Sequence, residues 1–236
     1  MKVLVTVKQV ATLDDRLDVE RAEWDLNSWD AHAAEAALEL GDEVVAVTVG
    51  GEQAREALLT VLAMGADRAV HITHDGPLDP LATARLLAPV VQREAPDLVL
   101  CGAHSADALN GATGVALAAL AGLPRMAAVK AIEVADGAAT VVREVEGGLV
   151  ERLRVKLPAL FTVQANINEP RYATLRGIRK AASKPLEVIA AEDIRPGAHV
   201  VATTVPPKGE GAEMLTGSAG EVAARIATII KSKVAG

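Results

Sequence analysis

The chain of 236 residues contains very few aromatic side chains and a single cysteine. Trp24, Trp29, Phe161 and Tyr172 are its only aromatic residues, so it lacks the stacking platforms on which many proteins hold nucleic-acid bases. Cys101 has no second cysteine to pair with, which excludes an internal disulfide and a cysteine-ligated zinc or iron–sulfur centre within one chain. The formal net charge of -7 also argues against a nucleic-acid partner.

Long apolar runs are missing as well. No uninterrupted apolar stretch reaches the length of a membrane span, so we expect a protein that is not membrane-embedded. The N-terminal sequence MKVLVTVKQV lacks the apolar core and the cleavage site of a secretory signal, and we expect a cytoplasmic protein. Hydrophobic residues nevertheless make up 50% of the chain, which is enough to build a large core from Ala, Val, Leu and Ile.

Short apolar runs alternate with helical patterns in the first half of the chain. The segments that read as buried strands are 2–8, 43–49, 68–72 and 97–102. The segments that read as helices are 30–40, 52–64, 79–94 and 111–121. Strands that are apolar on both faces and alternate with helices indicate a parallel sheet with helices on either side. With right-handed crossovers, this predicts an α/β, doubly wound, Rossmann-like fold with a mostly parallel sheet.

The pattern changes after Met126. Three further strands are predicted at 129–134, 139–145 and 149–157, joined by the turn signals Asp136-Gly137 and Gly147-Gly148, and a short strand at 161–165 follows. Residues 189–211 have no clear periodicity, and residues 215–233 read as a terminal helix. We therefore predict a nucleotide-binding domain of residues 1–188 with a hairpin-rich extension, and a C-terminal arm and helix, 189–236, that contact a partner subunit.

Ligands of open parallel sheets bind at the carboxyl ends of the strands. Here these ends are Thr6 to Gln9, Val49 to Gly51, and the loop from Gly102 to Gly114. We expect Asn110 to cap the helix that follows this loop, and the first N–H groups of that helix to suit a phosphate. The hydroxyl of Thr113 is placed to donate a hydrogen bond to the same group. The alternative is an ordinary glycine-bearing loop between a strand and a helix.

The sequence offers no catalytic constellation. It has neither the GxxxxGK[ST] motif of a P-loop nor the GxGxxG motif of a dinucleotide-binding fold. Cys101 ends a buried strand, where a cysteine is more often packed than reactive. His71 and His74 are too few to hold a metal ion. We therefore expect a nucleotide-holding protein that is not itself an enzyme and binds no metal.

A long pattern in the second half of the chain resembles the β (small) subunit of electron transfer flavoproteins. The pattern consists of VEGGLVERLRVKLPA at 145–159, NEPRYATL at 168–175 and PLEV at 185–188. AMGADR at 63–68 and VLVTVKQV at 3–10 match as well, so the similarity covers nearly the whole chain. The resemblance implies a sheet of the adenine-nucleotide-binding type and a heterodimer with a larger α subunit that carries most of the FAD site. It also implies transfer of electrons from flavin dehydrogenases, such as acyl-CoA dehydrogenases, to a membrane quinone oxidoreductase.

The resemblance further implies a buried, structural AMP in the β subunit, or a second FAD in the same place in the branch that performs electron bifurcation. The positions that match the nucleotide pocket of the family are Thr6, Asn27, Ser28, Trp29, Asp30, Val49, Gly102, Asp107, Asn110, Gly111, Ala112, Thr113 and Gly114. Leu13 occupies the place of an aromatic residue that touches the isoalloxazine ring in some relatives, and so is expected near the FAD.

The segment 171–184 concentrates positive charge in an acidic protein, with five basic residues and no acids. Leu175, Ile178 and Ala182 fall on one helical stripe. We expect Ile178 and Ala182 to face the protein and Leu175 to face outward, where the resemblance places a leucine that anchors the partner dehydrogenase. The predicted partner-recognition residues are Leu175, Arg176, Ile178, Arg179 and Lys180. The alternative is a solvated helix face with a buried leucine.

Two other classes of function are compatible with parts of the sequence. A nucleotide-binding module of the universal-stress type also uses a strand–loop–helix phosphate cradle, but it lacks the hairpins after Met126 and the C-terminal arm. A thiol-dependent hydrolase would use Cys101 as its nucleophile, and thiol-blocking reagents would then abolish its activity.

Overall fold

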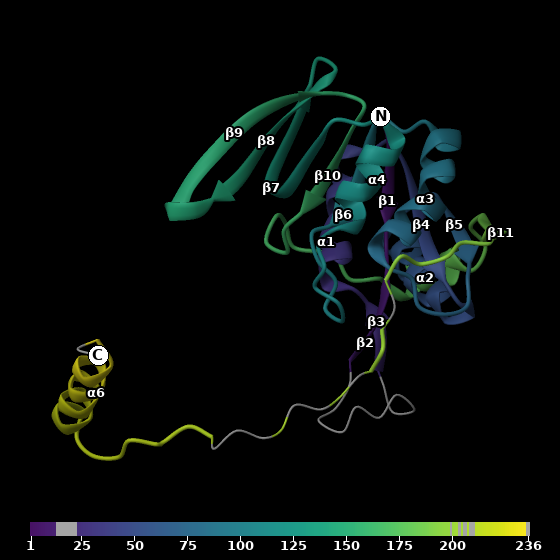
Figure 1. Cartoon of the computed structure of the whole chain (residues 1–236). Coiled ribbons are helices and arrows are strands. Elements are labelled where there is room, and N and C mark those ends of the chain that lie inside the picture. Colours follow the sequence, from purple (N-terminus) through teal and green to yellow (C-terminus); the bar gives the residue numbers. More distant parts are fainter. Residues whose placement is uncertain (13–22, 199, 203, 205–206, 208–210, 235–236) are drawn as a thin grey trace. The chain divides into compact units, whose positions relative to one another are not determined.

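A computed structural model gives the fold of the chain (Figure 1). It describes residues 1–12, 23–198, 200–202, 204, 207 and 211–234. By their mutual contacts the residues form two compact units, Met1–Val201 and Ala202–Gly236. The first unit contains the candidate functional site, and the second contains the C-terminal helix.

The first unit is built on a sheet of nine strands in the order β11-β5-β4-β1-β6-β10-β7-β8-β9. Its central strands are β1 (Lys2–Thr6), β4 (Glu43–Gly50), β5 (Arg68–Thr73), β6 (Leu98–Gly102) and β10 (Ala159–Val163). Each pairs with its neighbours in parallel. Their side chains are almost all buried, as expected for strands covered on both faces. The predicted α/β fold with a mostly parallel sheet is confirmed.

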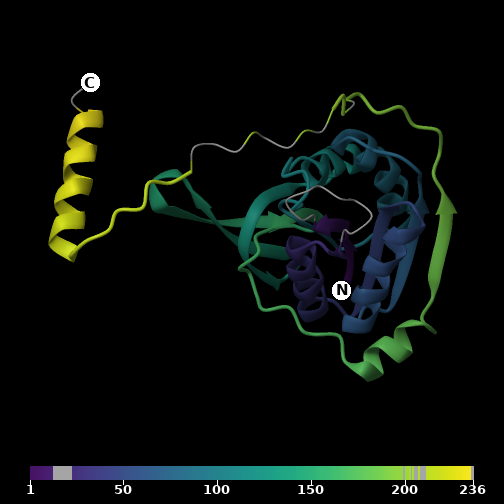
Figure 2. The same ribbon diagram turned by 90° about the horizontal axis from the view of Figure 1, so that it is seen from below.

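Four helices cover the two faces of this sheet (Figure 2). Their bounds are α1 (Ser28–Leu40), α2 (Arg55–Met64), α3 (Pro80–Glu94) and α4 (Thr113–Ala121), with a short 3-10 turn, Glu52–Ala54, before α2. Val5 of β1 belongs to the core cluster that contains residues of α1 and α2. Its neighbour Leu4 belongs to the cluster that contains residues of α3 and α4. Successive residues of one strand thus enter two separate cores, as the pleat of a strand requires.

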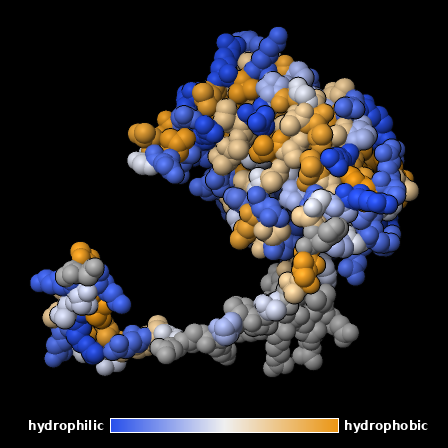
Figure 3. All heavy atoms as spheres, viewed as in Figure 1, coloured by the Kyte–Doolittle hydropathy of each residue, from blue (hydrophilic) through white to orange (hydrophobic). Residues whose placement is uncertain are grey.

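The predicted hairpins form an antiparallel extension of the sheet. Its strands are β7 (Arg125–Ala135), β8 (Ala138–Val145) and β9 (Leu149–Lys156). Asp136 and Gly137 both have positive φ angles, 51° and 69°, as a tight hairpin turn requires. At the far tip of the β8–β9 hairpin, Leu149 and Val150 are 67% and 56% exposed, and apolar surface gathers there in Figure 3.

Three strands were not expected from the sequence. β2 (Gln9–Thr12) and β3 (Glu23–Leu26) form a small antiparallel sheet of their own, in a region that reads as a polar loop. β11 (Leu186–Ala190) pairs in parallel with β5 at the edge of the large sheet. These strands are short, and β3 and β11 are largely exposed, so all three lack the continuous apolar run that marks a buried strand.

Two further helices lie near their predicted places. α5 (Leu175–Ala181) belongs to the first unit, and α6 (Ala219–Val234) to the second. Before α6, Ser218 and Glu221 form a reciprocal capping box in which the Glu221 carboxylate accepts hydrogen bonds from the N–H and hydroxyl of Ser218. Among the described residues, no helix is both long and apolar enough to cross a membrane.

An ion-pair network ties the amino-terminal edge of the sheet together. The side chain of Glu94, at the end of α3, is only 8% exposed. It accepts hydrogen bonds from Lys2 Nζ at 2.7 Å and from Arg68 Nη1 at 3.1 Å. Arg68, at the start of β5, also donates from Nε to Glu43 at 3.2 Å. The hydrogen bonds from Arg68, followed by those from Lys2, outweigh the effect of burial and lower the pKa of Glu94 to about 2.

We predict that Glu94→Gln lowers the free energy of unfolding by about 2–3 kcal/mol at pH 7, because it removes the mostly buried carboxylate that Lys2, Arg68 and Arg93 share. The folded-state pKa of Glu94 lies below its usual 4.5, so this contribution is present above that pH and is lost as the pH falls toward 2. Urea unfolding at pH 7 and pH 3 measures both effects.

The matched control is Glu133→Gln, whose partner Arg152 is 62% exposed while Glu133 itself is 71% exposed. This change should cost less than about 1 kcal/mol. Equal losses for the two variants would contradict the role assigned to the Glu94 network.

Candidate functional site

The predicted strand ends meet at one edge of the sheet. β1 lies between β4 and β6, and all three strands run in parallel. Thr6 at the end of β1, Val49 near the end of β4 and Gly102 at the end of β6 therefore lie at the same, carboxyl edge. This is the edge at which open parallel sheets hold their ligands.

The start of α1 is fastened to the loop that follows β6. Asn27 precedes the helix and is fully buried. Its Nδ2 donates to the carbonyl of His104 at 2.8 Å, and its Oδ1 accepts from the N–H of Ala106 at 3.2 Å. The structure thus brings Asn27 into contact with the loop from Gly102 to Gly114, far along the chain. Ser28, the next residue, is exposed.

Asp30, in the first turn of α1, is 6% exposed and binds two backbone groups. Its carboxylate accepts from the N–H of Lys8 at 2.9 Å and from the N–H of Gly102 at 3.0 Å. Burial raises the pKa of Asp30 to about 7, against the opposing effect of these hydrogen bonds and of Asn27. A Cβ atom on residue 102 would lie 2.3 Å from Asp30 Oδ1, so only glycine permits this contact.

Asp107 attaches the loop from Gly102 to Gly114 to Lys8, which follows β1. Lys8 Nζ donates to both carboxylate oxygens of Asp107 at 2.7 Å. Burial opposes the charged form of Asp107, but the hydrogen bonds from Lys8 and Ser105 outweigh it, and its pKa lies below the usual value. Asp107 therefore braces the loop against the end of β1.

The helix after the loop begins later than predicted. Asn110 is not its N-cap: α4 starts at Thr113, with Ala112 in the capping position and no side-chain hydrogen bond to the first turn. The reason is that Leu109 and Gly111, with φ angles of 52° and 59°, turn the chain on both sides of Asn110. Within the described part of the chain, the first N–H groups of α4 consequently have no side-chain cap, which leaves them available to an anion.

His104 was not among the predicted nucleotide-binding residues, although its place directly after β6 could have suggested it. Its Nδ1 atom is buried and makes no hydrogen bond within the described part of the chain. Its ring lies 5.9 Å from that of Trp29, centre to centre, in an edge-to-face arrangement. A Cβ atom on Gly111 would lie 3.1 Å from the ring. An unsatisfied buried nitrogen beside an indole and an uncapped helix start fits a polar, aromatic ligand such as an adenine nucleotide.

Gly114 and Cys101 contribute by packing. A Cβ atom on Gly114 would lie 2.6 Å from Thr162 Cγ2 and 3.2 Å from Cys101 Cβ, so this glycine lets α4 lie close to the sheet. Cys101 is 4% exposed, and burial raises the pKa of its thiol to about 12. A buried thiol that does not ionise cannot act as a nucleophile at neutral pH, which argues against the hydrolase alternative.

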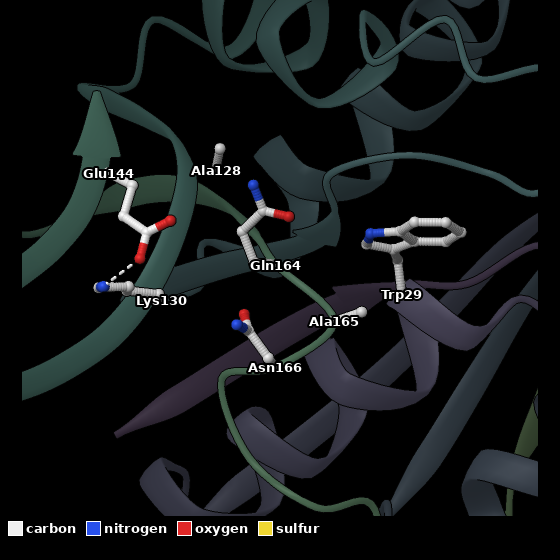
Figure 4. A pocket seen from close by; sticks show the side chains of 7 residues that line it. All are labelled: Trp29, Ala128, Lys130, Glu144, Gln164, Ala165 and Asn166. Carbon is white, nitrogen blue, oxygen red and sulfur yellow. Dashed lines mark hydrogen bonds and ion pairs between the residues drawn. The ribbon is translucent and has the colours of Figure 1, made fainter. Parts of the chain in front are cut away.

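A pocket of about 330 Å³ opens beside this region (Figure 4). Its lining residues are Trp29, Ala128, Lys130, Glu144, Gln164, Ala165 and Asn166. Lys130 and Glu144 form an ion pair on one side, while Trp29 lies on the other (Figure 4). Gln164 and Asn166 follow the end of β10, a strand end that the sequence interpretation did not consider. Leu13, expected near the flavin, lies outside the described residues.

The predicted recognition segment forms helix α5, which carries an exposed apolar stripe. Leu175 is 79% exposed, which rules out the alternative in which it is buried. Ile178 is 53% exposed, and Ala182 is also exposed, so the expectation that these two residues face the protein is wrong. Ala181 is the buried residue of the helix instead. Arg176, Arg179 and Lys180 lie on the exposed surface around the stripe.

Comparison with known proteins points to one family. The family described as "Electron transfer flavoprotein domain" matches residues 16–194. The chain is 37% identical to the electron transfer flavoprotein subunit beta of Methylophilus methylotrophus, over 98% of each chain. It is 40% identical to the mitochondrial subunit beta of Oryza sativa subsp. indica, over 92% of this chain and 94% of the relative. It is 33% identical to the subunit beta of Bacillus subtilis, over 99% of this chain and 98% of the relative.

We predict that Thr113→Val lowers the amount of nucleotide that copurifies with the protein. The change keeps the shape of the side chain but removes the hydroxyl at the uncapped start of α4, a loss of about 1 kcal/mol of binding or roughly fivefold in affinity. Nucleotide content per chain, measured after washing at matched dilution, reports the effect. Thr60→Val, on the exposed surface of α2, is the control. If the wild type and both variants retain equal amounts of nucleotide, Thr113 is not part of the site.

Proposed function

Because this chain belongs to the family of electron transfer flavoprotein β subunits, we propose that it is the smaller half of a heterodimeric electron carrier. In this proposal it binds an adenine nucleotide and helps an α subunit to hold FAD. The observation that carries the proposal is the cradle at the carboxyl edge of the sheet, where Asn27 and Asp30 fasten the start of α1 to the loop before α4. Among the residues that the structure describes, the cradle contains N–H groups without a side-chain cap and a buried nitrogen of His104 without a hydrogen-bond partner.

The nucleotide that we propose for this cradle is AMP, in a structural role. Its phosphate would lie at the start of α4, where N–H groups and the helix dipole favour an anion. Trp29 and His104 would border the base. The residues around the cradle bind and orient, and none is assigned a catalytic role. A second FAD is the alternative occupant, and it would place the protein in the bifurcating branch.

A bound flavin would supply the redox chemistry of the carrier. The contribution of this chain would be to help position that group. We propose Leu13 and the pocket bordered by Trp29 and Gln164 as the parts of the chain nearest to the flavin, since this pocket adjoins the cradle and is open to a partner.

We propose that residues 189–236 form the arm that contacts the α subunit. Helix α6 presents Ile226, Ile229 and Ile230, which are 45%, 46% and 56% exposed. These residues recur at helical spacing and form one apolar stripe. An apolar stripe of this kind is typical of a helix that lies against another protein. The proposed location is the cytoplasm, although the rice relative is named as mitochondrial.

We predict one adenine nucleotide per chain in the heterodimer produced by co-expression with its α subunit. Extraction with acid, followed by chromatography and mass measurement, identifies the bound nucleotides. One AMP and one FAD per heterodimer support the proposal. Two FAD molecules would replace it with the bifurcating alternative, and FAD alone would remove the nucleotide cradle from the proposal.

The exposed stripe of α5 is the proposed docking surface for the flavin dehydrogenase that donates electrons. A leucine that is 79% exposed beside Ile178 provides an apolar anchor, and Arg176, Arg179 and Lys180 surround it with positive charge. Long-range attraction between charges raises the encounter rate, whereas a buried apolar anchor supplies short-range affinity. The electrons would then pass to a membrane quinone oxidoreductase.

We predict that Leu175→Ala weakens the complex with the donor dehydrogenase by about 2 kcal/mol, roughly thirtyfold in KM, as expected for a hot spot. Thermal stability and flavin content should not change, because this side chain is exposed in the free chain. Steady-state kinetics with an acyl-CoA dehydrogenase as the electron donor measures the effect. The control is Leu120→Ala on α4, where the leucine is 41% exposed. A normal KM for Leu175→Ala would refute the proposed docking surface.

A further inference from the structure

The five basic residues of segment 171–184 fall into two groups in the structure. Arg176, Arg179 and Lys180 lie on the exposed surface of α5. Arg171 and Lys184, which flank the helix, instead bind groups of the protein body. The positive charge of the segment is therefore used both to attract a partner and to hold the helix in place.

The segment before α5 is held by a mostly buried carboxylate. Glu35, in the middle of α1, is 4% exposed. Arg171 donates to it from Nη2 at 2.7 Å, from Nε at 2.8 Å and from its backbone N–H at 3.0 Å. The hydrogen bonds from Arg171 outweigh burial and lower the pKa of Glu35. The two side-chain hydrogen bonds and the third bond to the backbone fix both the orientation of the segment at Arg171 and its distance from α1.

A second contact holds the same stretch of chain three residues earlier. The side chain of Asn168 donates from Nδ2 to the carbonyl of His32 at 3.1 Å. Asn168 Oδ1 lies 3.1 Å from Nδ1 of the same histidine. The chain that leads into α5 is thus fastened at two points along one helix.

The helix itself rests on the end of α2. A Cβ atom on Gly177 would lie 2.4 Å from the carbonyl oxygen of Ala63, so glycine allows the two backbones to touch. Thr174 caps α5 by accepting from the N–H of Gly177 at 3.0 Å. After the helix, Lys184 Nζ donates to the carbonyl of Leu62 at 2.9 Å, near the end of α2. These contacts provide the support that a seven-residue helix lacks in isolation.

We propose that Glu35 is a positioning residue for the docking of the electron-donating dehydrogenase. Through Arg171 it fixes the start of α5, so that Leu175 and Ile178 are presented on an already ordered surface. An anchor that is ordered before the encounter loses less conformational entropy on binding, and binds more tightly, than the same residues on a mobile loop. The inference rests on the proposed docking role of α5.

The test uses the heterodimer with Glu35→Gln, which keeps the size of the side chain but removes its charge. We expect amide hydrogen exchange in residues 171–183 to become at least about tenfold faster, with exchange in β1 and β6 unchanged. With the same acyl-CoA dehydrogenase as donor, KM should rise by about fivefold while kcat stays within a factor of two. The control is Glu133→Gln, which breaks an exposed ion pair between β7 and β9. It should change neither the exchange rates in residues 171–183 nor KM.

A combined variant separates positioning from a general loss of stability. If Glu35 acts through α5, Leu175→Ala should raise KM by a smaller factor in the Glu35→Gln background than in the wild type, because the anchor is already misplaced. Effects that multiply independently would overturn the inference. So would a lowered melting temperature of Glu35→Gln together with unchanged exchange in 171–183 and unchanged KM.

Failure of the proposed docking surface gives a different result. In that case Leu175→Ala alone leaves KM unchanged, whatever Glu35→Gln does. The exchange measurement then still decides whether Glu35 orders residues 171–183: faster exchange supports the ordering role, and unchanged exchange overturns it.

Discussion

The buried carboxylate of Asp30 is the contact on which the geometry of the candidate site depends. It joins the first turn of α1 to the N–H of Lys8 after β1 and to the N–H of Gly102 at the end of β6. Both donors are backbone groups, so the carboxylate fixes the path of the chain itself. Burial opposes its charge while the hydrogen bonds favour it, and the balance gives a pKa of about 7. Removing this side chain would leave two backbone donors unpaired in the interior.

The neighbouring contacts extend this constraint to residues 104–107 of the loop before α4. Asn27 binds its first half, and Lys8 braces Asp107 in the middle. The side chains act as supports, whereas the groups offered to a ligand are mostly backbone N–H groups at the start of a helix. The start of a helix can bind a phosphate without a P-loop or a GxGxxG motif, and the proposed site relies on this property. In the proposed site, the rings of Trp29 and His104 would border the base of the nucleotide.

The sequence allowed the central sheet to be predicted because strands buried on both faces appear as continuous apolar runs. It did not reveal β11, where Val188 is 60% exposed at the edge of the sheet. The prediction that Asn110 caps the helix was wrong because Leu109 adopts a left-handed conformation, which is rare for leucine and so is not expected from the sequence. The sequence located the candidate strand ends, but it did not reveal the hydrogen bonds of Asn27 and Asp30 that hold them together. Contacts such as that of Glu35 with Arg171 join residues 136 positions apart, and no local pattern encodes them.

The outer strand of the antiparallel extension has a consequence for how the chain behaves before it finds a partner. β9 is the last strand of the sheet, and its outer edge is open to pairing with a strand of another molecule. Arg152, Arg154 and Lys156 alternate along this strand and are exposed. A second copy that paired the same edge with β9 in antiparallel orientation would place the positive residues of both strands on one face, where like charges repel. The charge pattern of β9 thus guards newly made chains against edge-to-edge association, a safeguard built into the strand's own sequence.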